Sequence, residues 1–114
     1  MVAKPFVPDR GDLVWVGFNP TKGREQAKTR PALVVSPKAY NQKTGLSLMC
    51  PITSAQKGYP FEVEVKEKQV SGVILSDHVR SLDWQARNVR FIARANASVL
   101  SQVQRKLLLL LSEK

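Results

Sequence analysis

The sequence predicts a mainly β protein that ends in a single helix. Short β-branched and apolar runs, separated by glycine, proline and charged residues, recur about six times between residues 12 and 93. The final stretch changes period, because Val99, Val103 and Leu107 recur at helical spacing. Short strands followed by one helix are typical of a small, strongly bent antiparallel sheet or partial barrel with the helix packed against it.

The strands are predicted from their residue patterns. The first run is apolar at both alternating sets of positions, so we expect it to be covered on both faces. The run at 61–66 alternates apolar and charged residues, as a strand with one solvated face does. Pro51 lies near the end of another run, and because proline cannot donate to a ladder, we expect a bend or a sheet edge there. The six predicted strands are 12–18, 32–36, 46–53, 61–66, 72–77 and 89–93.

The connections between these runs are polar or rich in turn-forming residues. We expect a surface loop at 19–29. The segment 38–45 connects the second and third predicted strands, and the polar segment 78–88 separates the last two.

The C-terminal helix is expected to be capped by Asn96 or Ser98. Its five consecutive leucines, 107–111, form a wider apolar surface than one helix face needs. This width indicates either plain core burial or contact with a second subunit.

Length and charge limit the possible functions. A chain of 114 residues has room for one compact core, so we expect a single domain over residues 1–114. The 18 Lys and Arg residues outnumber the 9 Asp and Glu residues, which gives a formal charge of +9. Such a field attracts polyanions: nucleic acid, an acidic membrane surface or an acidic protein partner. A polyanionic partner is favoured over lysines that are merely solvated.

The sequence indicates a cytoplasmic protein. Cys50 is the single cysteine, so neither an intrachain disulfide nor a cysteine zinc cluster can form, which fits a reducing compartment. Residues 1–9 lack the apolar core of a signal peptide. The longest apolar run, 107–111, is far shorter than the roughly 20 residues that cross a bilayer.

Several catalytic mechanisms lack their motifs. The sequence has no His-Glu-x-x-His, P-loop, Gly-x-Gly-x-x-Gly or Gly-x-Ser-x-Gly motif. The carboxylates are scattered, so a two-metal nuclease site has few candidate ligands, and we expect neither a metal nor another cofactor. RNA can be cut without metal, because its 2′-hydroxyl can attack the adjacent phosphorus once a base takes its proton and cations stabilise the phosphate.

The segment 20–31 contains groups suited to that reaction. Glu25 is the single acid among six basic side chains between residues 22 and 43, and such a carboxylate stays ionised and can accept a proton; a surface salt bridge is the alternative. Arg30 adjoins the start of a strand, which suits a guanidinium that grips phosphate; a sheet-edge ion pair is the alternative. Thr53 ends a strand, where a threonine forms turns or donates to a phosphate oxygen.

Several motifs, in their order along the chain, resemble the MazF/PemK toxin family. The likeness extends over nearly the whole chain, and the order and spacing of the motifs are highly specific. They are Gly11-Asp12-Leu13-Val14-Trp15-Val16, Asn19-Pro20-Thr21-Lys22-Gly23-Arg24-Glu25-Gln26, Thr29-Arg30-Pro31-Ala32-Leu33-Val34-Val35-Ser36, Tyr40-Asn41, Lys43-Thr44-Gly45, Cys50-Pro51-Ile52-Thr53, Lys57-Gly58-Tyr59-Pro60-Phe61-Glu62-Val63 and Asp77-His78-Val79-Arg80-Ser81-Leu82-Asp83-Trp84.

The resemblance implies an SH3-like small barrel, shared with CcdB-like toxins, that forms a homodimer. It implies sequence-specific cleavage of single-stranded messenger RNA, which leaves a 2′,3′-cyclic phosphate and a 5′-hydroxyl and stops translation. It also implies a cognate acidic antitoxin as partner. By the same likeness, the catalytic arginine and threonine of the family fall on Arg30 and Thr53, and Glu25 matches a glutamate important for activity.

A further set of residues is expected to bind RNA. At His78, close relatives carry glutamine, so the histidine either accepts a proton or replaces the amide as a hydrogen-bonding group. Asp77 matches an acid used in another branch of the family, but the arginine two positions earlier in that branch is Leu75 here. The candidates are Lys22, Gln26, Lys28, Asn41, Lys57, Asp77, His78, Arg80, Trp84 and Arg87.

The two tryptophans have different expected roles. Trp15 lies inside an apolar strand and is expected in the core. Trp84 lies between polar residues, where stacking on an unpaired base and core packing are equally expected.

Two rival functions remain open at this point. A gyrase-binding toxin of the CcdB type shares the fold, but such toxins depend on an aromatic C-terminal end, whereas this chain ends Leu111-Ser112-Glu113-Lys114. A non-catalytic RNA-binding module is the second rival, and it would bind RNA without cutting it.

Overall fold

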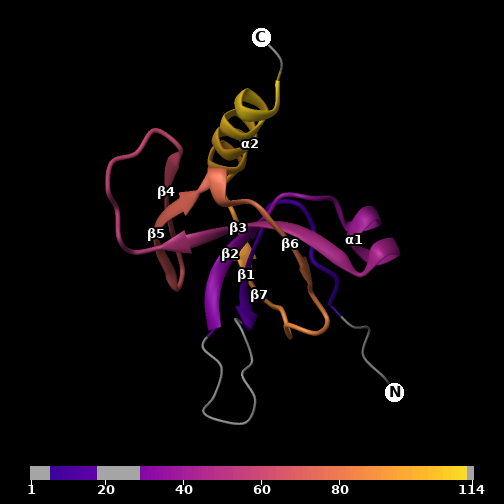
Figure 1. Ribbon diagram of the computed structural model, residues 1–114. Helices are drawn as coiled ribbons and strands as arrows, with labels where there is room; N and C mark the ends of the chain where they lie inside the picture. Colours follow the sequence, from indigo (N-terminus) through magenta and orange to yellow (C-terminus); the bar gives the residue numbers. More distant parts are fainter. Residues whose placement is uncertain (1–5, 18–28, 113–114) are drawn as a thin grey trace.

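The computed structural model describes residues 6–17 and 29–112. Within these residues, seven strands and two α-helices follow one another, with a short 3₁₀-helix between two of the strands (Figure 1). The elements are β1 (Asp12–Gly17), β2 (Thr29–Val34), α1 (Lys38–Thr44), β3 (Leu46–Thr53), β4 (Glu62–Glu67), β5 (Val70–Leu75), η1 (Ser76–His78), β6 (Arg80–Asp83), β7 (Arg90–Arg94) and α2 (Ala97–Leu111).

The strands form one strongly curled antiparallel sheet, a half-barrel, in the order β4-β5-β3-β2-β1-β7. The long strand β3 changes partner along one of its edges, because β6 pairs with residues 46–49 and β5 pairs with Ile52 and Thr53. The change falls at Pro51, which has no N–H to donate. The mainly β fold with a C-terminal helix is therefore confirmed. Pro51 itself stays within β3 and pairs with Ala32 of β2, while the partner on the other edge of β3 changes beside it.

Both faces of the central strands are covered, as the apolar pattern of β1 predicts. One buried cluster includes Leu13, Leu33 and Ile52 and packs under α2, whose Val103 is fully buried. The other cluster includes Val14, Val34 and Met49 and lies on the opposite face. Adjacent residues of one strand thus point into different cores, which fixes the strand register.

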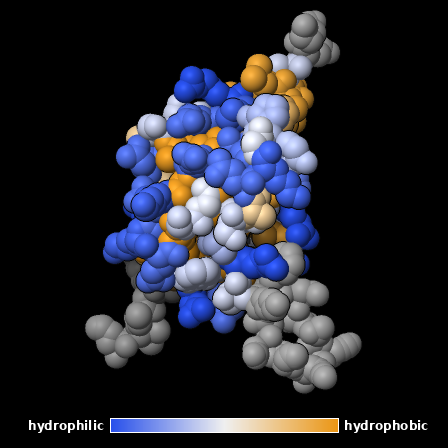
Figure 2. Space-filling model, turned by 90° about the vertical axis from the view of Figure 1, so that its left-hand side faces the viewer, coloured by the Kyte–Doolittle hydropathy of each residue, from blue (hydrophilic) through white to orange (hydrophobic). Residues whose placement is uncertain are grey.

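Helix α2 begins at a side-chain cap. The Oδ1 of Asn96 accepts the backbone N–H of Ser98 at 2.8 Å, as expected for a helix that starts after an asparagine. The far end of the helix is not covered, because Leu109 and Leu111 are 73% and 76% exposed. Figure 2 shows hydrophobic surface, in orange, at the upper right of the molecule.

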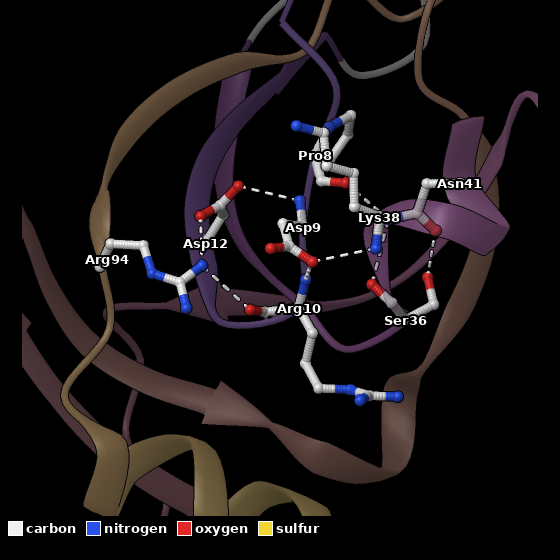
Figure 3. Close-up of polar contacts among 8 residues, drawn as sticks. All are labelled: Pro8, Asp9, Arg10, Asp12, Ser36, Lys38, Asn41 and Arg94. Carbon is white, nitrogen blue, oxygen red and sulfur yellow. Dashed lines mark hydrogen bonds and ion pairs between the residues drawn. The ribbon is translucent and has the colours of Figure 1, made fainter.

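Two regular elements differ from the sequence prediction. The connection at 38–45, for which no element was predicted, contains α1, and the polar segment 78–88 contains β6. Helix α1 has no cap from its own N-cap residue, but the Asp9 carboxylate accepts the N–H of Lys38 at 2.9 Å (Figure 3). A carboxylate at a helix N-terminus is favourable, and here it comes from 29 residues away, beyond the reach of a local pattern.

Candidate active site

The register between β2 and β3 places Arg30 beside Thr53. Ala32 pairs with Pro51 and Val34 with Met49, so the same register extended by two residues sets Arg30 opposite Thr53. Because side chains alternate along a strand, Arg30 and Thr53 share the face of Ala32 and Met49. β2 begins three residues earlier than predicted, so Arg30 lies inside a strand rather than before it.

A groove runs along this face of the sheet. A hollow of about 430 Å³ has an apolar floor of Ala32, Met49 and Leu82. A second hollow of about 360 Å³ shares Thr53, Leu75 and His78 with the first. Together they form one surface, which we call the Arg30 groove. Its polar residues are Arg30, Thr53, His78 and Arg80 from the first hollow and Lys57, Tyr59, Glu62 and Asp77 from the second.

The hydroxyl of Thr53 is oriented by its own turn. Its oxygen accepts the backbone N–H of Ala55 at 3.1 Å. A hydroxyl has one proton to donate, and this contact uses an acceptor site of the oxygen. The Thr53 proton is therefore available for an acceptor in the groove.

Lys57 is held by its own loop. The carboxylate of Glu62 accepts the backbone N–H groups of Lys57 and Gly58 at 3.0 and 2.9 Å. On the other side of this loop, Lys106 of α2 donates to the carbonyl of Pro60 at 2.6 Å. The loop that carries Lys57 along the Arg30 groove is thus tied to both β4 and α2.

The 3₁₀-helix η1 supplies Asp77 and His78. Ser76, at its start, is fully buried and donates its N–H to the carbonyl of Phe61 at 3.1 Å. His78 Nε2 lies 3.9 Å from a carboxylate oxygen of Asp77, and both side chains are largely exposed. An anchored turn therefore presents both polar groups to the groove.

Cys50 does not act as a nucleophile here. The residue is fully buried in the core. Burial raises the pKa of its thiol to about 12, and the negative charge of Asp77 adds to the effect. A thiol with such a pKa stays protonated at neutral pH, and the thiolate is the reactive form.

Two residues predicted to bind RNA are buried instead. The Asn41 side chain is fully buried, where its amide donates to the carbonyls of Pro8 and Ser36 at 2.8 and 3.0 Å (Figure 3). Trp84 is 7% exposed and belongs to the second core cluster. Neither lines the Arg30 groove. The prediction was therefore wrong for the fully buried Asn41, whereas for Trp84 the alternative of core packing is confirmed.

The remaining predicted site residues lie elsewhere. Arg87 is half-buried, and its guanidinium donates to the carbonyl of Gly17 at 3.4 Å, away from both hollows of the groove. Glu25, Lys22, Gln26 and Lys28 lie outside the described residues.

Trp15 has a role beyond the expected one. It packs against the first core cluster, as predicted, but is only half-buried. Its other side lines a third hollow together with Gln69 and Ser71, two polar residues that carried no signal in the sequence.

No group of three or more His, Cys, Asp or Glu side chains that could hold a metal ion occurs among residues 6–17 and 29–112. In the same described part of the chain, no helix is long and apolar enough to cross a membrane.

Known proteins match this chain in sequence and in overall fold. The chain is 56% identical to the endoribonuclease toxin MazF of Escherichia coli over 82 residues, which cover 72% of this chain and 74% of that protein. The crystal structure of MazF from Deinococcus radiodurans matches with a TM-score of 0.83 and 55% identity, covering 94% of this chain and 98% of that one. A MazE-MazF crystal structure from the same organism matches with a TM-score of 0.85 and 50% identity, covering 96% and 100%.

A family model matches nearly the whole described chain. The match spans residues 9–111, from the turn before β1 to the last residue of α2. The chain therefore belongs to the PemK-like, MazF-like toxins of type II toxin–antitoxin systems.

Proposed function

We propose that Arg30 and Thr53 form the catalytic centre with which this endoribonuclease toxin cuts single-stranded messenger RNA. One observation supports the proposal: Arg30 and Thr53, whose hydroxyl is oriented by its own turn, line the same hollow of the Arg30 groove, and the β2–β3 register extended by two residues sets the two residues opposite each other. The groove can receive a phosphate between a cation and a hydroxyl donor, which is the arrangement that stabilises charge developing on phosphate oxygens.

The proposed reaction uses the substrate's own nucleophile. The 2′-oxygen attacks the adjacent phosphorus, and the bond from phosphorus to the 5′-oxygen breaks. One proton leaves the 2′-hydroxyl and one is taken up by the 5′-oxygen, so the products are a 2′,3′-cyclic phosphate and a 5′-hydroxyl. Arg30 neutralises the extra charge on phosphorus, and Thr53 donates to a phosphate oxygen. We assign the proton acceptor to Glu25, which lies outside the described residues.

The rest of the Arg30 groove fits an unpaired RNA chain. Arg80 and Lys57 add positive charge on either side of Thr53. His78 and Asp77 add hydrogen-bonding groups that can distinguish base edges, which a single strand leaves open. We therefore propose that cleavage depends on the RNA sequence and needs no metal.

A cleavage assay tests this function. The toxin is incubated with a long RNA in the presence of EDTA, and the 5′ ends of the fragments are mapped. We expect discrete cuts at a recurring short sequence, with cyclic phosphate on the upstream fragment. Binding without cuts would support the non-catalytic module instead, and inhibition of DNA gyrase without cuts would support the CcdB type.

The role of Arg30 is tested with a matched variant. Arg30→Ala is expected to slow cleavage on the order of 100-fold or more, as the loss of a charge-stabilising donor commonly does. Arg105→Ala removes the same side chain from an exposed position on α2 and is expected to leave the rate unchanged. Cleavage by Arg30→Ala at the parental rate would refute the catalytic assignment.

We further propose that the toxin has an acidic antitoxin as partner. The formal charge of +9 favours an acidic protein, and the solved relatives from D. radiodurans include MazE-MazF structures. A bound antitoxin that covers the Arg30 groove should stop cleavage, and its affinity should fall as salt concentration rises. We place the free toxin in the cytoplasm, where messenger RNA is translated.

We also propose that the toxin is a homodimer. The exposed residues Leu108 and Leu111 adjoin an apolar hollow that Val35 and Val79 also line. A second copy would cover this surface. Leu108→Glu should shift the mass measured by light scattering toward one chain, whereas Gln102→Glu, at an exposed position of the same helix outside this hollow, should not.

A further inference from the structure

We propose that the third hollow, which Trp15 lines and which we call the Trp15 hollow, is a subsite for one nucleobase next to the cleaved phosphate. This base would lie on the face of the sheet opposite to the Arg30 groove. This inference rests on the proposed function, because it assumes that the phosphate lies at Arg30 and Thr53. The hollow has a volume of about 380 Å³. It lies within the range of about 300–1,000 Å³ that is usual for ligand sites.

The Trp15 hollow and the Arg30 groove share four lining residues, two from β2 and two from β3. Arg30, Pro31, Ile52 and Thr53 line both the Trp15 hollow and the larger hollow of the groove. The two nevertheless lie on opposite faces of the sheet. Trp15 pairs with Pro31 on the face of the first core cluster, whereas Val16 pairs with Arg30 on the face of the second. If the cleaved phosphate of an RNA chain is held at this end of the sheet, the nucleotide on one side of it would enter the Trp15 hollow and the nucleotide on the other side would enter the Arg30 groove.

The composition of the Trp15 hollow suits a base rather than a phosphate. Arg30 is the single charged residue among the described residues that line it. The indole of Trp15 and the ring of Pro31 offer flat apolar surface. Unpaired bases bind proteins by stacking on aromatic side chains and by hydrogen bonds along their exposed edges.

Two polar residues can provide those hydrogen bonds. Gln69 and Ser71 line the hollow and are exposed. Gln69 lies at the tip of the β4–β5 hairpin, next to Lys68, whose φ of 37° marks the tight turn. An amide side chain has both donors and an acceptor, so it can distinguish one base edge from another.

The stacking surface is held firmly before RNA binds. Trp15 lies in β1 between two neighbouring strands, opposite Pro31 of β2 and Arg90 of β7. Its buried side packs against the first core cluster. A ring fixed in this way loses little conformational entropy on binding a base, which favours affinity.

The test uses RNA that binds but cannot be cut. The mapped cleavage sequence is synthesised with a 2′-deoxy nucleotide at the cut, which removes the attacking hydroxyl. The bases on either side of the cut are then replaced, one at a time, by abasic sites. We expect one of the two replacements to weaken binding to the parental toxin by roughly tenfold, the scale of a lost stacked base.

Variants of Trp15 test whether the loss of binding caused by the abasic site depends on this residue. Trp15→Leu should weaken binding of the intact RNA by a similar factor and lose the response to the abasic site. Trp15→Phe keeps an aromatic ring and should retain most of the response. The control Phe91→Leu removes an exposed aromatic ring on β7 and should behave as the parent does. Thermal unfolding of each variant establishes that it is folded.

A fluorescent base gives an independent measurement. 2-Aminopurine placed at the responsive position should be quenched by stacking on binding to the parental toxin, and much less on binding to Trp15→Leu. In addition, Gln69→Ala should relax the base preference at that position when fragment ends are mapped. Equal responses to the abasic sites in the parent and in Trp15→Leu would refute the subsite. That result would leave the proposed function standing if Arg30→Ala still abolished cleavage.

Discussion

Trp84 donates its indole N–H to the backbone carbonyl of Asn41 at 2.9 Å, across 43 residues of sequence. The contact joins the end of β6 to helix α1, and both side chains are buried. These two residues therefore hold α1 against the sheet. The hydrogen bonds of these two side chains stabilise the fold, so substitutions at either residue should lower stability.

Asn41→Ala is expected to destabilise the protein strongly. The Asn41 amide donates to two carbonyls and its oxygen accepts the Ser36 hydroxyl at 2.6 Å, all in a buried site (Figure 3). Alanine would leave these groups without partners, at a cost of about 2–4 kcal/mol in the free energy of unfolding. Urea denaturation measures the change. Gln42→Ala, at the exposed neighbouring position, should change stability by less than about 0.5 kcal/mol.

Trp84→Phe is expected to lower stability without changing the cleavage sequence. The substitution removes the indole N–H and part of the buried ring, but Gly45 also donates to the Asn41 carbonyl, so that oxygen keeps a partner. We expect a loss of about 1–3 kcal/mol. Fragment ends produced by the variant should map to the parental sequence. A changed base preference would mean that Trp84 contacts RNA after all.

The sequence predicts those elements whose signals are local. The apolar pattern of β1 and the helical spacing of α2 predict both elements nearly to their ends, because each buries a face that its own period defines. Helix α1 has no such signal. It has seven residues, and its N-terminal cap comes from Asp9, so only the folded chain shows why it forms.

The candidate site also contains residues that local motifs predict and residues whose place depends on the folded chain. Arg30 and Thr53 are found from motifs, but their proximity depends on the β2–β3 register, which no local pattern gives. Asn41 and Trp84 are polar or amphipathic residues whose burial depends on packing between distant segments, so their sequence context was misleading. Gln69 enters the Trp15 hollow only because the β4–β5 hairpin folds toward β1.

Cys50 is expected to make stability depend on alkaline pH. Its thiol has an ordinary pKa of 9.0 when unfolded and a pKa of about 12 when folded, because burial disfavours the thiolate. Its contribution to stability is therefore complete below pH 9 and is lost as pH rises from about 9 to 12, by about 1 kcal/mol per pH unit. Denaturation of the parent and of Cys50→Ala at several pH values isolates this effect. The two proteins should differ in slope in this range, and parallel curves would contradict the prediction.

Thr53 offers a test of the proposed catalytic hydroxyl with minimal change in shape. Thr53→Val keeps the volume and the β-branched form but removes the hydroxyl proton and the oxygen that accepts the Ala55 N–H. We expect the cleavage rate at saturating RNA to fall on the order of 100-fold, because a donor to the reacting phosphate is lost. Thr53→Ser retains the hydroxyl and the turn, so it should keep most of the rate. Single-turnover cleavage separates the two effects: a loss confined to binding, with an unchanged rate constant, would assign Thr53 to substrate binding rather than to catalysis.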